Sequence, residues 1–448
     1  MHYRDVVSDS RRVTPGVLFV AIPGVNVDGA RFIRQAREKG AAAVMGATED
    51  CDIRVSNPRR AYAEACAEHF GNPSQQLLLC GITGTNGKTT TTLLLRDMLA
   101  QGGLQPGLIT TVAIEWPGHS EPAACTTPDA HALQTTLNAM TKASCRAAVM
   151  EVSSHAIDQE RIAGCHYAVL AFTNLTQDHL DYHGTMEAYY QAKAKLFLDH
   201  PETPAVINQD DPYGKRLLTE LTAAGHKRLF PYSPSTISAT FSAQGTEATF
   251  VLKGRTLSFK TALCGRYNLA NLLCAATAAT ALGVTTDAIL CAITAARPQW
   301  GRLEPVAPGV FVDYAHTDDA LANVLATLRE ITTGKLICVF GCGGDRDRTK
   351  RPKMAAAVER YADTILVTSD NPRTEDPDAI IADILPGFTH AKPMTEPDRR
   401  IAIRKALTLK TDADVVLIAG KGHEPYQEIK GVRYPYSDAE EVRAFYAD

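Results

Sequence analysis

The chain lacks the cysteine pattern of a disulfide-bonded or zinc-binding protein. Its 11 cysteines are scattered, and no two of them form a Cys-x-x-Cys pair. Cys80, Cys274 and Cys338 lie within apolar runs, as small buried hydrophobic residues do. We therefore expect neither a disulfide framework nor a cysteine-ligated metal, and the pattern favours the reducing cytoplasm.

An excess of charge of one sign is also absent. The 46 lysines and arginines nearly balance the 50 aspartates and glutamates, and the formal net charge is -4. We therefore expect no strongly basic surface of the kind that binds nucleic acid or an anionic membrane. Any binding of anions must come from local sites.

Long apolar runs and a leader sequence are missing as well. Residues 1–16 contain no basic segment followed by an apolar core, so no signal peptide is expected. The most apolar stretch, residues 272–296, is interrupted by Gly283 and Asp287. Because a membrane span needs about 20 predominantly apolar residues, this stretch predicts two buried helices instead.

The sequence does contain strand-like apolar runs that alternate with helical patterns along its whole length. This alternation is typical of α/β domains with mostly parallel sheets. At about 150 residues per domain, 448 residues suggest three domains. We place them at residues 1–75, 76–300 and 301–448, with the turn-forming residues 72–76 as the first linker.

The predicted strands end in polar or glycine-rich segments, where ligands gather in parallel sheets. In the first domain, strands at 16–22 and 41–46 flank a helix at 28–40, and a second helix follows at 59–71. A hairpin that turns at Lys253-Gly254 is predicted at the edge of the second sheet. The other predicted strands are 77–83, 146–154, 168–175 and 204–209 in the second domain, and 309–317, 335–344, 363–371 and 414–422 in the third.

Residues 81–99, GITGTNGKTTTTLLLRDML, have the composition of a phosphate-binding loop. Glycines permit a tight turn, Lys88 adds a charge for the β and γ phosphates, and the hydroxyl of Thr89 can reach Mg²⁺. The positive end of the following helix lies at the same place. The first glycine of the pattern GxxxxGK[ST] falls at Ile82, so an ordinary strand-to-helix turn stays an alternative. The predicted nucleotide-binding residues are Gly84, Thr85, Asn86, Gly87, Lys88, Thr89 and Thr90.

A second polar cluster follows two of the predicted strands. Glu151 ends one strand, and His179 and His183 stand four residues apart after another. Their spacing alone suggests zinc, but no helix pattern and no third soft ligand support it. The histidines are either polar loop residues or, beside a phosphate loop, one of them joins Glu151 in a Mg²⁺ site of mainly oxygen ligands. Lys193 and Lys195 lie on a later helix, where solvated lysines are the ordinary outcome.

The loop sequence TGTNGKT resembles the ATP-dependent Mur ligases, a family that includes folylpolyglutamate synthetase as a relative. SDSRRVTPGVLFVAIPGVNVDGARFI is similar to the uridine-nucleotide-binding domain of the tripeptide-forming members. The other family motifs follow in order as TTPDA, EVSSHAIDQERI, TNLTQDHLDYHG, GRYNLANLLCA, WGRLEPV, DYAHTDDAL, GCGGDRDRTKRPKM, SDNPRTEDP and GKGHEPYQ. The resemblance implies a small α/β uridine-nucleotide-binding domain, a central P-loop ATPase-like domain with a parallel sheet and a C-terminal Rossmann-like domain.

The resemblance also implies the chemistry. Family members use ATP as co-substrate, with Mg²⁺, to convert a carboxylate into an acyl phosphate, which an amino acid then attacks during peptidoglycan synthesis. The implied substrate that carries this carboxylate is UDP-N-acetylmuramoyl-L-alanyl-D-glutamate. A carbamylated lysine in a matching AKxxLF segment identifies Lys193, and a carbamate requires that burial lower the pKa of that amine. The implied catalytic residues are Lys88, Lys193, His179 and Arg302, and the implied magnesium ligands are Thr89, Glu151, His179 and the carbamate of Lys193.

Binding roles follow from the same resemblance. Asn271 and Arg302 are expected to contact ATP, and Asp313 its ribose. Two positions depart from the family pattern, since Cys125 stands where an amide often precedes the paired threonines and Asp318 replaces a proline. The residues expected to hold the uridine nucleotide and its muramoyl-dipeptide are Ser10, Val25, Asn26, Val27, Thr126, Thr127, Ser153, Gln159 and Arg161.

The two candidate amino-acid substrates, diaminopimelate and lysine, differ in charge. Diaminopimelate differs from lysine by a second carboxylate at its far end, which a planar arginine fork binds bidentately. Arg373 of the DNPR segment and Arg346 of GGDRD supply such forks, although DNPR alone is also compatible with a proline turn and a solvated arginine. In the family, DNPR marks the diaminopimelate enzymes, and Glu424 is expected to face the distal ammonium. The predicted pocket is Arg346, Asp370, Asn371, Pro372, Arg373, Gly420 and Glu424.

Three alternatives stay open. The same ligase reaction with L-lysine is the nearest, and a folylpolyglutamate-synthetase-like ligase would leave the first domain and the DNPR loop without a role. A nucleotide-gated switch would have no use for Glu151, His179 and Lys193. Because ATP must meet the amino acid between the second and third domains, we expect the third domain to close. The expected partners are small molecules, namely ATP, the nucleotide dipeptide and meso-diaminopimelate, and the chain is expected to be a monomer.

Overall fold

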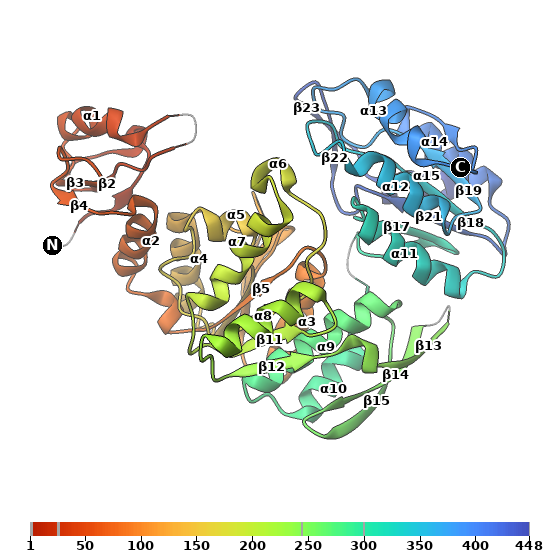
Figure 1. Cartoon of the computed structure of the whole chain (residues 1–448), viewed down its shortest axis with the longest axis horizontal. Coiled ribbons are helices and arrows are strands. Elements are labelled where there is room, and N and C mark those ends of the chain that lie inside the picture. The colour runs from red at the N-terminus through yellow and green to blue at the C-terminus, as the bar shows by residue number, and fades with distance from the viewer. Residues whose placement is uncertain (1–2, 25–26, 243–244, 299–300, 448) are drawn as a thin grey trace.

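The chain forms three lobes, each built around its own sheet (Figure 1). The computed structural model describes residues 3–24, 27–242, 245–298 and 301–447. The N-terminal lobe projects to one side, the central lobe carries a large sheet covered by helices, and the C-terminal lobe lies on the other side (Figure 1). This arrangement agrees with three α/β domains, although their exact limits stay a prediction. None of the helices in the described part of the chain has both the length and the apolarity to cross a bilayer.

The first lobe contains a parallel sheet in the order β1-β2-β3-β4. The strands predicted at 16–22 and 41–46 are confirmed as β2 and β3. Two further strands were not predicted, because strands of two residues are too short to show an alternating pattern. The elements are β1 Val6–Val7, β2 Leu18–Val20, α1 Ile33–Glu38, β3 Ala43–Gly46, β4 Ile53–Arg54 and α2 Pro58–His69.

The central sheet has the order β12-β11-β10-β5-β9-β6-β7-β8. The first six strands are parallel, and β7 and β8 extend the sheet as antiparallel strands that the sequence did not reveal. Glu151, at the end of β9, pairs with Ile82 of β5, so the ends of these strands meet. The strands are β5 Leu78–Thr83, β6 Pro106–Ile109, β7 Ala113–Trp116, β8 His119–Pro122, β9 Ala147–Glu151, β10 Val169–Phe172, β11 Ala205–Asn208 and β12 Leu229–Tyr232.

Helices bury both faces of this sheet. Leucines and alanines of α3, α9 and α10 form one apolar cluster, while α4, α5, α7 and α8 contribute to a second cluster on the other face. The two buried helices predicted within residues 272–296 are confirmed as α9 and α10. The helices are α3 Lys88–Gln101, α4 Ala130–Lys142, α5 Ser154–Asp158, α6 Leu180–His183, α7 Met186–Leu198, α8 Pro212–Ala223, α9 Arg266–Ala281 and α10 Thr286–Ala295.

The predicted hairpin exists, but its predicted place at the edge of the central sheet is wrong. β13 Ser238–Ser242, β14 Gly245–Leu252 and β15 Arg255–Thr261 form a separate antiparallel sheet. Alternate residues such as Phe250 and Leu257 join the cluster that contains Leu272 of α9 and Ile289 of α10. A strand with one apolar face needs an apolar surface beneath it, and these two helices provide that surface.

The third lobe contains a sheet in the order β16-β17-β21-β18-β19-β20, parallel except for β16. The four predicted strands are confirmed, and the short β16 and β20 and the hairpin β22–β23 are additional. The elements are β16 Glu304–Ala307, β17 Val310–Asp313, α11 Asp318–Ile331, β18 Leu336–Phe340, α12 Lys350–Glu359, β19 Thr364–Val367, α13 Pro377–Ile384, β20 Met394–Thr395, α14 Arg399–Leu409, β21 Val415–Ala419, β22 Tyr426–Ile429, β23 Val432–Pro435 and α15 Asp438–Ala447.

A buried ion pair joins the last two helices of this lobe to its sheet. Arg399 donates from Nε and Nη2 to the two oxygens of Asp438 at 2.8 and 2.7 Å, and both side chains are fully buried. The same guanidinium donates to the carbonyl oxygens of Ser369 and Ala419. It therefore ties α14 and α15 to the ends of the strands that lead into Asp370 and Gly420.

We predict that Arg399→Met destabilises the third lobe by about 3–5 kcal/mol, because it leaves the carboxylate of Asp438 buried without a partner. The matched control is Arg433→Met in the same lobe, since Arg433 is exposed and its guanidinium lies 3.8 Å from the partly exposed Glu428. A surface pair contributes only about 0–1 kcal/mol. Equilibrium unfolding in urea measures both, and similar small losses for the two variants would contradict the prediction.

Candidate active site

The phosphate loop is packed too closely to admit side chains at two of its positions. Gly84 has φ +145° and Gly87 has φ +84°, both in the region that favours glycine. A Cβ atom at Gly84 would lie 1.9 Å from Oγ1 of Thr173, and one at Gly87 would lie 2.2 Å from Oδ1 of Asn271. The loop is therefore held between the end of β10 and helix α9.

Hydrogen bonds from the neighbouring strand fix the shape of this loop. The backbone N–H groups of Thr85 and Asn86 donate to the carbonyl and the side-chain oxygen of Asn174, each at 2.9 Å. Thr173 donates through its hydroxyl to the carbonyl of Asn86 at 2.7 Å. Helix α3 begins directly after the loop, so its free N–H groups face the same space.

Two lysines converge on one carbonyl oxygen of the loop. Lys88 donates to the carbonyls of Gly84 and Thr85 at 3.1 and 2.8 Å, and Lys193 donates to that of Gly84 at 2.9 Å. Lys193 is fully buried, and desolvation together with the charge of Lys88 lowers its pKa well below the usual value. Lys88 keeps some exposure, yet desolvation around its Nζ also lowers its pKa. Both amines are therefore easier to deprotonate than solvated lysines.

A cavity of about 160 Å³ lies against the loop and is called the phosphate cavity here. Its walls include Lys88, Thr89, Glu151 and His179. Lys193 lies behind the loop and is not among the lining residues. The carboxylate of Glu151 is buried and accepts a hydrogen bond from the N–H of Thr111 at 2.9 Å.

The two predicted histidines do not converge on one point. Desolvation lowers the pKa of His179 despite the opposing charge of Asp178, so its ring is neutral at pH 7. His183 instead forms a hydrogen bond between Nε2 and the hydroxyl of Ser154 at 2.9 Å. Within the described ranges, no group of three or more His, Cys, Asp or Glu side chains is placed to hold a metal ion. A zinc site is thus unsupported, whereas Mg²⁺ needs only one or two carboxylates beside substrate phosphates.

Arg302 brings a cation from the third lobe to the phosphate cavity. Its Nη2 donates to the hydroxyl of Thr89 at 3.4 Å, and its guanidinium lies 4.8 Å from the ring centre of Tyr314. Its Nε is buried and has no hydrogen-bond partner among the described residues. A water or an anion such as a phosphate can satisfy a buried donor of this kind.

A second cavity, the nucleotide cavity, lies between α9 and α11 and measures about 120 Å³. Asn271 and Asp313, whose contacts with ATP stay a prediction, line it, and Asp319 and Asn323 do so as well. Asn86 donates to Asp319 at 2.9 Å, which links the central lobe to the third lobe. No sequence motif pointed to this contact, because it joins residues far apart in the chain.

Asp313 already has partners for both of its carboxylate oxygens. They accept the N–H groups of Leu303 and Ala315 at 2.6 and 2.7 Å. Burial raises the pKa of Asp313 to about 6, although Arg302 and these two N–H groups oppose the shift. The residue therefore fastens the segment that connects the lobes, and its contact with a ribose stays a prediction. Asp318 occupies the first turn of α11, which Thr317 caps.

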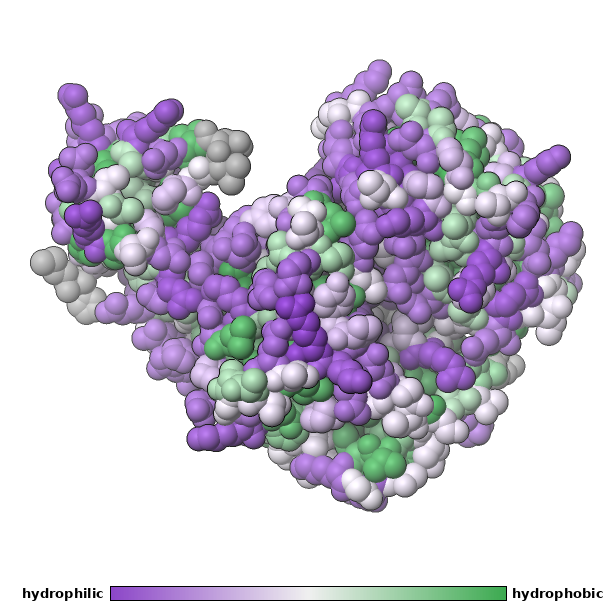
Figure 2. All heavy atoms as spheres, in the orientation of Figure 1, coloured by the Kyte–Doolittle hydropathy of each residue, from purple (hydrophilic) through white to green (hydrophobic). Residues whose placement is uncertain are grey.

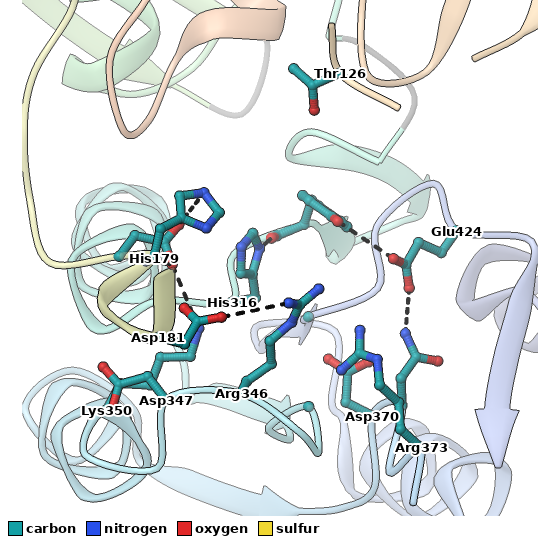
Figure 3. A pocket seen from close by; sticks show the side chains of 15 residues that line it. Thr126, His179, Asp181, His316, Arg346, Asp347, Lys350, Asp370, Arg373 and Glu424 are labelled. Atoms are coloured by element: carbon teal, nitrogen blue, oxygen red, sulfur yellow. Dashed lines mark hydrogen bonds and ion pairs between the residues drawn. The ribbon is translucent and has the colours of Figure 1, made fainter. Parts of the chain in front are cut away.

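A third cavity of about 270 Å³, the amino-acid cavity, opens between loops of the third lobe and central-lobe residues such as Thr126 and His179 (Figure 3). All the residues predicted for this pocket line it except Pro372. Arg373 adopts φ +51° and donates to the carbonyl of Gly344 at 2.6 Å, which holds its guanidinium over the GGDRD loop. Glu424 accepts from Asn371 at 2.7 Å and from Tyr314 at 3.4 Å (Figure 3).

Sequence reasoning missed a lysine that lies behind the residues lining this cavity. Lys421 is fully buried and donates to Asn371 at 2.9 Å and to Glu424 at 3.1 Å. Its ammonium also lies 3.8 Å from a carboxylate oxygen of Asp370. Lys421 stands inside the GKGHE segment, but only burial distinguishes it from a solvated lysine.

The phosphate and amino-acid cavities adjoin each other. The residues that line both are Thr126, Asp178, His179, Tyr314 and His316. The two lobes also touch at this junction, since Gln177 donates to Asp347 at 3.1 Å and Asp178 lies 3.9 Å from the ammonium of Lys350. A group held at the phosphate loop and a molecule in the amino-acid cavity would therefore lie on two sides of one shared wall.

A cavity of about 370 Å³ separates the first lobe from the central lobe. Gln159 and Arg161 line it as expected of dipeptide contacts, together with Cys125 and Arg59. The side chain of Gln159 accepts two hydrogen bonds from the guanidinium of Arg161, which also donates to the carbonyl of Thr127 at 3.1 Å.

The other residues predicted to hold the nucleotide dipeptide are dispersed. Thr127 is buried and bonds to the backbone at Glu151 and Ser153, and Ser153 caps helix α5. Ser10 lies buried in a short 3₁₀ helix, and Val27 is exposed beside the first lobe. Val25 and Asn26 lie outside the described residues.

Comparison with known proteins gives consistent matches along the chain. Residues 2–70 match the model of the Mur ligase family catalytic domain, residues 82–279 that of the Mur ligase middle domain, and residues 301–422 that of the Mur ligase glutamate ligase domain. The chain is 45% identical over 464 residues to the UDP-N-acetylmuramoyl-L-alanyl-D-glutamate–2,6-diaminopimelate ligase of Synechococcus elongatus, covering 98% of this chain and 93% of the relative.

Solved structures show the same similarity. A structure named for the same ligase activity superposes with a TM-score of 0.71 at 33% identity, covering 99% of this chain and 94% of that one. The folylpolyglutamate synthase of Mycobacterium tuberculosis, solved with ADP and AMPPCP, superposes with a TM-score of 0.69 at 21% identity, covering 87% and 95%. At that identity the second match supports the fold alone.

We predict that Gly87→Ala abolishes detectable binding of ATP, because the new Cβ collides with Asn271. Gly103→Ala is a matched control, since Gly103 has nearly the same φ, +81°, and open space around it. Its expected cost is only the backbone strain, about 1–2 kcal/mol. Calorimetric titration with ATP checks the outcome, and equal affinities in both variants would contradict the close packing of the loop.

Proposed function

The chain belongs to the Mur ligase family, and we propose that it is the ATP-dependent ligase that adds meso-diaminopimelate to UDP-N-acetylmuramoyl-L-alanyl-D-glutamate in peptidoglycan biosynthesis. The observation that carries the proposal is that the phosphate cavity shares lining residues with a cavity lined by Arg346 and Arg373. The names of relatives about 45% identical over nearly the whole chain support the same reaction.

Each of the three substrates is assigned to the cavities described above. ATP lies with its phosphates on the loop and its adenosine in the nucleotide cavity, between the central and third lobes. The nucleotide dipeptide extends from the first lobe past Gln159 and Arg161 toward Thr126, which lines the junction of the cavities. Diaminopimelate occupies the amino-acid cavity.

The reaction begins with activation of a carboxylate, which is otherwise a poor acyl donor. The γ-phosphoryl group of ATP passes to the side-chain carboxylate of D-glutamate, and the acyl phosphate is then attacked by the amine of diaminopimelate. An amide and inorganic phosphate result. The protein contributes chiefly by positioning the reactants and by stabilising their negative charge. Lys88, Arg302 and the N-terminus of α3 supply the positive charge for this.

The residues beside the loop fit a magnesium ion. Thr89 and Glu151 offer oxygen ligands in the phosphate cavity, and a neutral His179 offers a nitrogen. Bound there, Mg²⁺ would neutralise phosphate charge. The buried, pKa-lowered amine of Lys193 meets the requirement of a carbamate, which forms only on a neutral amine. Carbamylation of Lys193, the monomeric state and the cytoplasmic location stay predictions.

Selectivity for diaminopimelate over lysine is assigned to the arginines. Arg373 is held by Gly344, and Arg346 lies 3.9 Å from Asp181, so both guanidinium groups face the amino-acid cavity with donors to spare (Figure 3). The distal carboxylate of diaminopimelate satisfies such donors, and lysine has no equivalent group. The distal ammonium is assigned to Oε1 of Glu424, which accepts a long hydrogen bond of 3.4 Å from Tyr314, whereas Oε2 accepts from Asn371 and Lys421.

Phosphate release from ATP tests the proposed function directly. With the purified protein, Mg²⁺ and the nucleotide dipeptide, we expect release when meso-diaminopimelate is added and little when L-lysine replaces it. Mass spectrometry of the nucleotide product identifies the new amide. Equal release with both amino acids would refute the assigned substrate, and no release with either would refute the ligase.

We predict that Arg373→Met lowers kcat/KM for diaminopimelate roughly 10- to 150-fold, which corresponds to about 1.5–3 kcal/mol for hydrogen bonds to a charged group. The matched control is Arg433→Met, which removes an exposed arginine on β23 that lines none of the described cavities. Steady-state kinetics compare the two variants. An unchanged kcat/KM in Arg373→Met would remove that residue from the pocket.

A further inference from the structure

The proposed ligation requires a proton acceptor that has not yet been assigned. The amino group of a free amino acid is an ammonium ion at neutral pH, and an ammonium ion has no lone pair with which to attack an acyl phosphate. A base must therefore lie within reach of the amine, at the junction of the phosphate and amino-acid cavities.

His316 lies at this junction. It is one of two residues, with Tyr314, that line the phosphate, nucleotide and amino-acid cavities together. Figure 3 shows its ring in the middle of the amino-acid cavity, between His179 and Glu424. Strand β17 ends three residues earlier, so the imidazole is carried by the sheet and not by a long loop.

The hydrogen bonding of His316 leaves one nitrogen free to accept a proton. Nδ1 lies 2.7 Å from the carbonyl oxygen of Tyr314. A carbonyl only accepts, so Nδ1 must carry the hydrogen and Nε2 must hold the lone pair of the neutral ring. Over the described ranges of the chain, no donor is bonded to this Nε2.

Charges around the ring favour its neutral form. Burial lowers the pKa of His316, and Lys350 of α12 and Arg302 lower it further, while Asp178 and the bond to Tyr314 oppose the shift. His423, after β21, is also close enough to interact, and its own pKa is lowered to about 4 by burial and by nearby charges. His316 is therefore neutral at pH 7 with Nε2 unprotonated, and Asp178 is the charge that favours its protonated form.

We propose that His316 is the general base that removes a proton from the attacking amino group of diaminopimelate, an inference that rests on the function proposed above. Nε2 takes one proton from the ammonium, and the freed lone pair forms the C–N bond to the acyl carbon. The bond between that carbon and the phosphate oxygen then breaks. The second proton of the nitrogen leaves with the phosphate as hydrogen phosphate, and the imidazolium returns its proton to solvent.

The other acceptors that line the amino-acid cavity have partners or assigned roles. Asp181 lies 3.9 Å from the guanidinium of Arg346. Asp347 accepts hydrogen bonds from Gln177 and Thr349. Asp178 accepts from the backbone N–H of His179 at 2.9 Å and faces Lys350. Asp370 and Glu424 are both close to the buried ammonium of Lys421. His179 is assigned to the metal. His316 is the remaining neutral base among the described residues of this wall.

The test compares two nucleophiles in His316→Asn and His316→Gln. Hydroxylamine is uncharged at neutral pH and traps the acyl phosphate as a hydroxamate without needing a base, whereas diaminopimelate needs one. We expect the ratio of diaminopimelate ligation to hydroxamate formation to fall by about 10²–10⁴, the usual contribution of a general base. The deficit should shrink as the pH rises toward the pKa of the amine. His423→Asn is the matched control and should keep the wild-type ratio, because His423 lines none of the three cavities.

Each outcome decides the question. Equal losses with both nucleophiles would show that His316 only contacts the nucleotide, and an unchanged ratio would exclude it as the base; either result overturns the proposal. If neither variant folds, the wild-type protein is tested at saturating substrates. The rate of ligation must then fall at acid pH while the rate of hydroxamate formation does not. A fall in both rates would overturn the proposal. Absence of hydroxamate from the wild-type protein would instead refute the proposed function itself.

Discussion

The site depends on the carbonyl oxygen of Gly84, on which two ammonium groups converge. Lys88 and Lys193 both donate to it, at 3.1 and 2.9 Å. The loop can place this oxygen only because Gly84 has no side chain, since a Cβ would collide with Thr173. Desolvation and the charge of Lys88 lower the pKa of Lys193, which favours its neutral form. The absence of a side chain at Gly84 thus helps to bring the two amines onto one oxygen.

The third lobe contributes to this centre through one short stretch of chain. Arg302 reaches Thr89, Asp313 binds the backbone of Leu303 and Ala315, and His316 lines three cavities. The segment that connects the lobes is therefore also part of the site. In the space-filling view of Figure 2 the central and third lobes adjoin, while the first lobe stands apart across a hollow. Substrates held between lobes can thereby influence the orientation of the lobes, and the orientation decides whether the reacting groups meet.

Motifs in the sequence predicted those parts of the structure that depend on residues close together in the chain. A buried strand, a glycine turn and a lysine predicted the phosphate loop, and the place of Glu151 at a strand end followed from its position in a parallel sheet. The wrong placement of the hairpin shows the limit of such predictions. Alternation of apolar and polar residues indicates that a strand has an apolar face, but it does not identify the surface that covers this face. Lys421 and Asp319 were missed for a related reason. Their roles come from burial and from contacts between lobes, and the spacing of residues in the sequence reveals neither.

The bond between Asn86 and Asp319 crosses the wall of the nucleotide cavity and joins two lobes. Residues of both lobes therefore form the wall of one cavity. A ligand bound there would contact both lobes at once. By linkage, its binding free energy would add to the stability of the contact between the two lobes.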